Sequence, residues 1–158
     1  MHYTAEMARE MYPQAITIFV GPCVAKRGEA KSDPAVDLVI TYEELAALFT
    51  AKKINTEKMT PVKLTKPATT AGRGFPAERG IIHAIEAYIK NRTPVKPVIV
   101  NNFNKKTIKL LKAYATKECP GNLIEIMACE GGCLGGSGCI ASPKAAEKRL
   151  KELIKENN

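Results

Sequence analysis

Short apolar runs alternate along the chain with segments whose apolar residues recur at helical spacing. Each run is brief and rich in β-branched residues, which predicts buried strands over 15–20, 36–40, 97–100 and 123–128. The three- and four-residue spacing between them predicts helices over about 42–49, 77–90, 105–116 and 143–155. Strands that alternate with helices predict an α/β fold: a mostly parallel sheet with helices on both faces.

Two of these predicted helices have clear start signals. Thr41 with Glu44 three residues later predicts a capping box, and Ser142 before Pro143 predicts an N-cap followed by a first-turn proline. By contrast, residues 51–77 contain three prolines and little periodicity. That segment is predicted to be a long surface or active-site loop.

Cysteines follow two of the predicted strands at the point where each strand ends. Cys23 comes after the first strand and a Gly-Pro pair, and Cys129 comes directly after the last strand. Ligands of open parallel sheets gather beyond the carboxyl ends of the strands. We therefore expect these two cysteines to share one site, although over a hundred residues separate them.

The last cysteine segment has the composition of a metal-binding loop. Cys129 and Cys133 form a C-x3-C pair with glycines close by. Thiolates hold iron–sulfur clusters, and glycines let the backbone approach a cluster closely. Zinc sites more often use duplicated C-x2-C or C-x4-C pairs, and neither His2 nor His83 has ligand spacing. An iron–sulfur centre is favoured over zinc, which is kept as a lesser alternative.

The remaining cysteines leave alternatives open. Cys23 lies near Lys26 and Arg27, which would stabilise a thiolate, but it could equally be a buried cysteine at a strand end. Cys139 is either a substitute or additional ligand or a loop thiol without a role, and Cys119 is interpreted as an ordinary cysteine. The odd count and the lack of a secretory signal argue against a disulfide framework.

Composition narrows the class of protein. A chain of 158 residues with 45% hydrophobic residues suits one domain with its own core. No apolar run approaches the roughly 20 residues that span a bilayer, so a soluble, cytoplasmic protein is expected. The net charge of +8 comes from lysines scattered over the chain, which favours solvated helix faces over a nucleic-acid site. An acidic redox partner is left open.

Two motifs resemble those of a known family. PCVAKRGEA (22–30) and IEIMACEGGCLGGSGC (124–139) resemble the second and third signature motifs of the iron-only hydrogenase catalytic domain. VDLVITYEELAALF and GRGFPAERGIIHAIEAYI, which lie between them, are also similar to that family and occur in its order. The resemblance covers nearly the whole chain, so 1–158 is interpreted as a single domain, one lobe of the H-cluster domain of such a hydrogenase.

The resemblance implies a cofactor and its ligands. The cofactor would be a 4Fe-4S cluster joined through one cysteine to a di-iron subcluster, and it would carry out H2 ⇌ 2H+ + 2e−. Cys23 and Cys129 would be cluster ligands, and Cys133 would bridge the cluster to the di-iron unit. Partners would be the remainder of the hydrogenase polypeptide and ferredoxin or another redox protein.

The resemblance also implies three residues around the di-iron unit. Lys26 would donate a hydrogen bond to a cyanide ligand, and Glu29 matches an acid of the family's proton route. Met127 would pack against the di-iron unit.

Departures from the family pattern define an alternative function. The first motif, a cysteine pair followed by proline, is missing, so this chain alone is expected to lack a ligand and to be inactive, and whether it carries the cofactor without the rest of the protein is left open. Gly21 and the Gly-Ser-Gly-Cys ending fit divergent branches of the family with a proposed sensory role. The alternative is a non-catalytic hydrogenase-like module that binds an iron–sulfur cluster with Cys139 as fourth ligand, or serves as an interaction domain.

Overall fold

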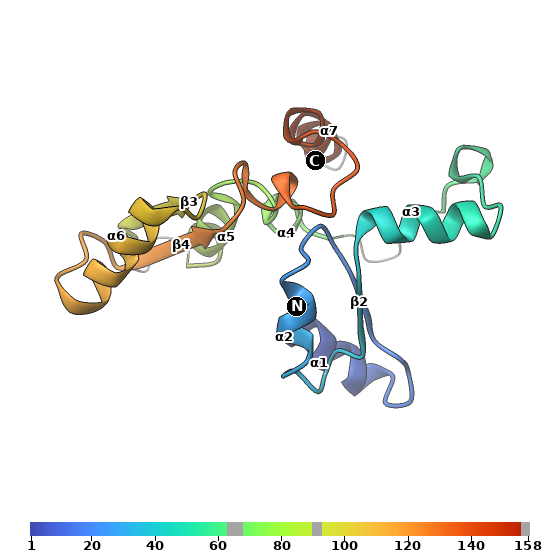
Figure 1. Ribbon diagram of the computed structural model, residues 1–158, viewed down its shortest axis with the longest axis horizontal. Coiled ribbons are helices and arrows are strands. Elements are labelled where there is room, and N and C mark those ends of the chain that lie inside the picture. The colour runs from blue at the N-terminus through green and yellow to red at the C-terminus, as the bar shows by residue number, and fades with distance from the viewer. Residues whose placement is uncertain (63–67, 90–92, 156–158) are drawn as a thin grey trace. The chain divides into compact units, whose positions relative to one another are not determined.

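The computed structural model describes residues 1–62, 68–89 and 93–155, and these divide into two compact units (Figure 1). The first unit comprises Met1–Val62 and Gly136–Ile140, and the second comprises Lys63–Gly135 and Ala141–Asn158. In chain order, the first unit contains α1 (His2–Met11), β1 (Ile18–Val20), α2 (Lys26–Ala30), β2 (Leu38–Ile40), α3 (Tyr42–Ala51) and the 3-10 turn η1 (Thr56–Lys58). The second contains α4 (Thr70–Gly74), α5 (Gly80–Ile89), β3 (Pro97–Asn101), α6 (Lys105–Thr116), β4 (Leu123–Met127), the 3-10 turn η2 (Gly132–Gly135) and α7 (Pro143–Lys155).

In the first unit, β1 and β2 pair in parallel and α2 packs against β2. Polar contacts hold the approach to these strands. The Asp37 carboxylate accepts a hydrogen bond from the Thr17 backbone N at 2.7 Å. It also forms an ion pair with Arg9 at 2.9 Å, and this ion pair ties α1 to the sheet. These hydrogen bonds, followed by the Arg9 charge, lower the pKa of Asp37. Ala35 and Val36, just before β2, are buried.

In the second unit, β3 and β4 pair in parallel over five residues, and α4 packs against α5 and α7. Ile82, Val100 and Met127 are at most 5% exposed and form the described part of this unit's hydrophobic core. Asn104 caps α6, because its side chain accepts hydrogen bonds from the Lys106 and Thr107 backbone N–H groups. The second unit therefore combines a longer strand pair with larger buried side chains.

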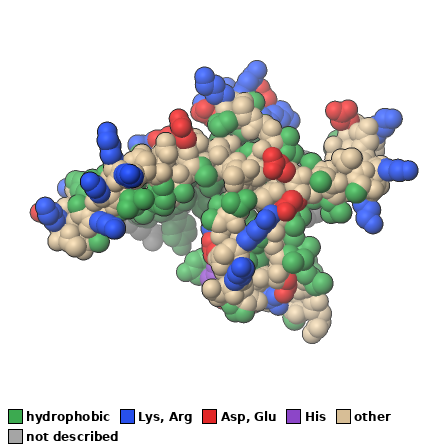
Figure 2. All heavy atoms as spheres, viewed as in Figure 1, with side chains coloured by type: hydrophobic (Ala, Val, Ile, Leu, Met, Phe, Trp, Pro, Cys, Tyr) green, Lys and Arg blue, Asp and Glu red, His purple; other side chains and the backbone are tan. Residues whose placement is uncertain are grey.

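The predicted α/β class with parallel strands is confirmed, but the described strands form two two-stranded sheets in place of one sheet. In the first sheet the side chains of Ile18 and Leu38, which lie opposite each other, are 52% and 53% exposed. About half of each of these two side chains is therefore open to solvent. Figure 2 shows hydrophobic side chains lying open on the surface beside Lys and Arg.

The helix predictions hold where the local signals were strong. The capping box of Thr41 and Glu44 opens α3, and α6 and α7 have the predicted bounds. The helix predicted over 77–90 runs from Gly80 to Ile89, and residue 90 lies outside the described residues. The loop prediction over 51–77 is wrong for α4. Helix α4, like α2, has five residues, which is too short to show a helical period, so neither was predicted. Helix α1 was not predicted because it has no side-chain cap. Within the described ranges, no helix is long and apolar enough to cross a membrane.

The single-domain interpretation of 1–158 stays a prediction, since each of the two units is compact by itself.

Candidate metal centre

Cys23 lies at the carboxyl end of β1, as the sequence predicted. The Gly21 backbone N donates to the Ile40 carbonyl at 3.1 Å, which extends the strand pairing to the residue before Pro22. Cys23 itself is half-buried, and its carbonyl accepts from the Lys26 backbone N at 3.2 Å. This turn leads the chain directly from the cysteine into α2.

Helix α2 brings together two of the predicted site residues. Lys26 and Glu29 form an ion pair one helical turn apart, and both side chains are partly exposed. On the same helix, Arg27 pairs with Glu44 at 2.5 Å. The Thr41 backbone N–H and then Arg27 lower the pKa of Glu44. The cations that follow Cys23 are therefore matched by carboxylates.

Cys139 belongs to the first unit, where its backbone lies beside the Cys23 loop. The Gly138 backbone N donates to the Pro22 carbonyl at 2.9 Å, and the Gly138 carbonyl accepts from the Glu43 backbone N at 3.4 Å. A Cβ atom on Gly138 would lie 2.5 Å from the Thr41 Cβ, so only glycine allows this approach. The half-buried Cys139 is thereby placed at the carboxyl ends of β1 and β2.

Cys129 and Cys133 lie in the second unit, on the loop that leaves β4. The Asn102 backbone N donates to the Met127 carbonyl at 3.0 Å, so the β3–β4 pairing continues to within two residues of Cys129. Gly131 and Gly132 then adopt φ values of 78° and 69°, which favour glycine. Cys129 is half-buried, and the exposed Cys133 follows on η2. The glycine turn thus folds the C-x3-C segment into one tight loop.

Met127, at 5% exposure, lies beside this loop together with two residues that the sequence did not point to, the half-buried Asn101 and the buried Glu125. Asn101, the register partner of Met127, has a buried Oδ1 with no hydrogen-bond partner among the described residues. Glu125 is 3% exposed, and its carboxylate accepts from the backbone N–H groups of Arg79 and Ile82 at 2.7 and 3.0 Å. An acidic residue on the apolar face of a predicted strand was the available signal for Glu125.

The donor set fits an iron–sulfur centre in its chemistry. All five cysteines lie in the described ranges and none forms a disulfide, and thiolates are the usual ligands of such clusters. The structure brings together Cys23 and Cys139 in the first unit, and Cys129 and Cys133 in the second. In the part of the chain that the structure describes, no three Cys, His, Asp or Glu residues form a group that could hold a metal ion by themselves.

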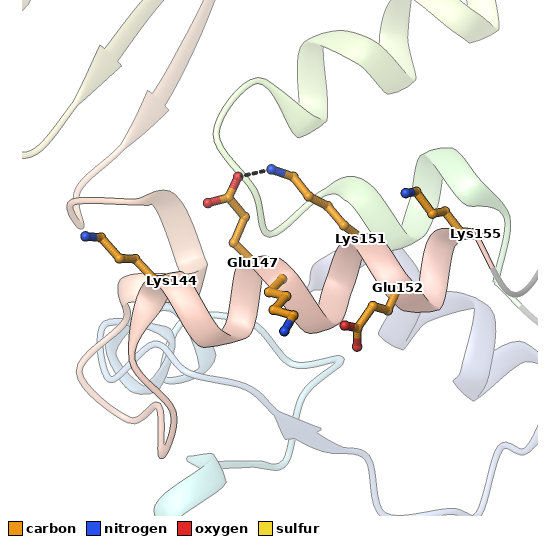
Figure 3. Close-up of a pocket in the computed structure, with 6 residues that line it drawn as sticks. Lys144, Glu147, Lys151, Glu152 and Lys155 are labelled. Carbon is orange, nitrogen blue, oxygen red and sulfur yellow. Dashed lines mark hydrogen bonds and ion pairs between the residues drawn. The ribbon is translucent and has the colours of Figure 1, made fainter.

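The lysines of α7 lie on an exposed face of the helix together with glutamates. A shallow surface depression runs along this helix, and Figure 3 shows lysines and glutamates alternating around it. Lys151 pairs with Glu147 at 2.6 Å, and Arg149 pairs with Glu152 at 3.2 Å. Such exposed pairs contribute little stability, and the depression has the character of a solvated helix face. The depression is lined by Lys144, Glu147, Lys148, Lys151, Glu152 and Lys155.

Fold and loops together define an α/β protein whose parallel strands end in cysteine–glycine segments. Residues 1–137 match the family "Iron only hydrogenase large subunit, C-terminal domain", and the chain belongs to this family. The predicted resemblance is thus confirmed.

Solved hydrogenase structures share the fold. One, the HydA(deltaEFG) structure that revealed stepwise [FeFe]-hydrogenase H-cluster assembly, is 17% identical with a TM-score of 0.61. The alignment covers 88% of this chain and 52% of that one. A second, which describes [FeFe]-hydrogenase oxygen inactivation through modification and degradation of the H cluster 2Fe subcluster, is 16% identical with a TM-score of 0.60. That alignment covers 97% of this chain and 57% of the second hydrogenase chain. The chain therefore spans a little over half the length of these hydrogenases.

Proposed function

We propose that this chain is part of the catalytic domain of an iron-only hydrogenase and binds an iron–sulfur and di-iron centre. Family membership supports this function. The observation that carries it is that Cys23 and the Cys129–Cys133 loop each directly follow a parallel strand pair of the hydrogenase fold. When bound, the centre would supply the interconversion of H2 with protons and electrons, or H2 sensing, in the whole protein.

The ligands in this proposal are Cys23 and Cys129 for the 4Fe-4S cluster and Cys133 as the thiolate that links it to the di-iron subcluster. The left-handed glycines support the assignment of the second loop, because they leave its backbone N–H groups free of Cβ crowding. Met127 would provide an apolar wall, since it is buried next to Gly132.

In this proposal Lys26 donates hydrogen bonds to an anionic ligand of the centre, and Glu29 belongs to the route by which protons reach it. An ammonium group has three donors, so Lys26 can hold Glu29 and still donate to an anion such as a cyanide. The ion pair with Lys26 would hold the Glu29 carboxylate in place in the first turn of α2. The proposed electron partner is ferredoxin or another redox protein, and the proposed compartment is the cytoplasm.

Anaerobic reconstitution with iron and sulfide tests this function. Wild-type chain should take up iron and sulfide and show the broad visible absorption of a cluster, whereas Cys129→Ser and Cys133→Ser should lose most of it. Cys119→Ser is the matched control, because Cys119 lies just past the end of α6, outside both cysteine loops. Equal loss in the Cys119 variant, or no uptake by the wild type, would contradict the proposal.

A second candidate is a non-catalytic hydrogenase-like module that binds an iron–sulfur cluster with Cys139 as a ligand. The hydrogen bond from Gly138 to Pro22 favours it, because that bond brings the Cys139 backbone beside the Cys23 loop. Cys139→Ala discriminates between the two: loss of a stable cluster in this variant supports the second candidate, and an unchanged cluster supports the first.

A further inference from the structure

We propose that Glu125 is the positioning residue of the C-x3-C loop. Its carboxylate fixes the backbone of Pro76–Arg79, and the turn that presents Cys133 rests on that backbone. The inference builds on the proposed function of Cys133 as a ligand, and it adds a residue that neither the cysteine motifs nor the family match assigns.

Glu125 is a buried acid with both carboxylate oxygens engaged. It is 3% exposed, Oε1 accepts from the Arg79 backbone N at 2.7 Å, and Oε2 accepts from the Ile82 backbone N at 3.0 Å. A buried carboxylate is costly unless it is hydrogen-bonded, so these bonds determine where the first turn of α5 lies relative to β4. Both donors are backbone groups more than forty residues away in the sequence.

The segment that Glu125 holds has a backbone that does not form easily by itself. Arg79 has a φ of 65°, in the left-handed region that disfavours a residue with a side chain. Gly80 lies so close to the preceding turn that a Cβ there would be 2.0 Å from the Gly74 carbonyl oxygen. The hydrogen bond to the Arg79 N–H therefore stabilises a conformation that the chain would otherwise leave.

The cysteine loop rests on this same segment. A Cβ on Gly132 would lie 2.8 Å from the Pro76 carbonyl oxygen and 2.7 Å from the Met127 sulfur. Gly132 directly precedes Cys133, while Met127 and Glu125 occupy alternate, buried positions of β4. One packed layer thus runs from Glu125 through the Pro76–Arg79 backbone to Gly132, so movement of that backbone moves Cys133.

Position 125 requires two hydrogen-bond acceptor oxygens, which a glutamate side chain has and a glutamine side chain does not. A glutamine has nearly the same volume, but its amide group would bring N–H donors against one backbone N–H donor. Glu125→Gln therefore removes one hydrogen bond and leaves the packing volume unchanged.

The test uses Glu125→Gln in the metal-free chain first. Hydrogen exchange at the Arg79 or Ile82 amide should rise about fivefold, the factor equivalent to one net hydrogen bond of about 1 kcal/mol. Hydrogen exchange should also speed up at the Gly132 amide, which donates to the Cys129 carbonyl in the turn before Cys133, while alkylation of Cys23 and Cys119 stays at the wild-type rate. After reconstitution, the electron paramagnetic resonance lines of the cluster should broaden and iron content should fall.

Two control variants separate positioning from stability. Glu118→Gln changes an exposed acid and should match the wild type in every readout. Val100→Ala removes packing from a residue that is 2% exposed in the same unit, so it lowers stability while leaving both hydrogen bonds of the Glu125 carboxylate in place. If Glu125→Gln differs from the wild type no more than Val100→Ala does, or if exchange at the Gly132 amide is unchanged, the inference is overturned.

A further variant covers the case in which Glu125→Gln does not fold. Arg79→Gly relieves the left-handed conformation, so adding it to Glu125→Gln should restore folding and part of the exchange protection of the Gly132 amide. Failure of the double variant to restore either one counts against the inference. Failure of the wild type to bind a cluster would instead contradict the proposed function, because exchange and alkylation are measured without metal.

Discussion

The first and second units each pair two parallel strands, yet the strands lie in different surroundings. Val100 of β3 and Met127 of β4 are 2% and 5% exposed, whereas Ile18 of β1 and Leu38 of β2 are more than half exposed. An isolated two-stranded sheet is marginal in water. The second unit offsets this with buried side chains, and the first depends more on polar contacts.

Those polar contacts lie at both ends of the first unit's sheet. Asp37 holds the entry to the strands through Thr17 and Arg9, and Gly138 holds their carboxyl ends through the Pro22 carbonyl. Hydrogen bonds have defined directions, so they can set a loop conformation where apolar burial is limited. The same hydrogen-bond pattern of a strand pair is thus maintained by packing in one unit and by side-chain and loop contacts in the other.

The largest expected effect comes from truncating the second unit's core. Ile82→Ala should lower the free energy of unfolding by roughly 2–5 kcal/mol, because Ile82 is fully buried and a cavity would remain. Leu38→Ala in the first unit should cost about 1 kcal/mol or less, since half of the side chain already contacts solvent. Urea titration followed by circular dichroism measures both. Equal losses would remove the contrast between the units.

Next in size is the glycine that holds the first unit's strand ends. Gly138→Ala should cost about 1–3 kcal/mol, because the new Cβ would lie 2.5 Å from Thr41 and displace the loop from Pro22. Gly28→Ala in α2 is the matched control, with no atom within 4 Å of the added Cβ. It should stabilise the chain by roughly 0.5–1 kcal/mol through its helix preference. Thermal unfolding of the two variants should therefore shift in opposite directions.

Both units also use capping boxes, which allows a direct comparison. Thr41→Ala and Asn104→Ala should each lower stability by about 1 kcal/mol, with the larger loss at Thr41 because it is only 4% exposed. Thr50→Ala near the end of α3 serves as the control, since its hydroxyl bonds an already helical carbonyl. A larger loss at Asn104 than at Thr41 would show that burial does not strengthen the first unit's cap.

The smallest effect concerns the pH dependence of the first unit. A hydrogen bond to Asp33 at 3.0 Å raises the pKa of His2 above 6.5, with Glu6 adding to the shift, and lowers the pKa of Asp33 below 3.8. The stability contributed by His2 is therefore complete below pH 6.5 and is lost as pH rises through the higher pKa of the folded state. The contribution of Asp33 is complete above pH 3.8 and is lost as pH falls through its lowered pKa.

Chemical unfolding of His2→Ala across pH measures this dependence. The variant should differ from the wild type most between pH 3.8 and 6.5 and converge with it at higher pH. Asp33→Asn should lose the same stability over the same pH range, and the double variant should be no less stable than either single variant. A His2→Ala difference that grows as pH rises would contradict the assignment.

Local signals explain what the sequence could predict of the fold. The cap at Thr41 and the first-turn proline of α7 act within a few residues, so α3 and α7 begin where the sequence predicted, and the helical spacing of apolar residues predicted α6. The strands β3 and β4 followed from continuous β-branched runs. The division of the four strands into the pairs β1–β2 and β3–β4 did not follow from the sequence, because strand partners depend on contacts far apart in sequence.

The candidate site was predictable to the same degree. Strand ends placed Cys23 and Cys129, and the structure agrees with both positions. Glu125 stands in the second quoted motif and on the apolar face of a predicted strand, but its role was missed because its partners are backbone N–H groups, which no sequence pattern identifies. The location of Cys139 depended on Gly138 meeting Pro22, a contact that no local pattern signals. The metal-binding roles of the cysteines stay predictions.

The contact between Gly138 and Pro22 also orders events during synthesis. Over a hundred residues separate the two, and Gly136–Ile140 is the last part of the first unit to be translated. At roughly 5–20 residues per second, a ribosome would take on the order of ten seconds to supply it after Cys23 has emerged. During that interval the Cys23 loop lacks the Gly136–Ile140 segment that hydrogen-bonds to it, so the first unit cannot close until that segment has been made.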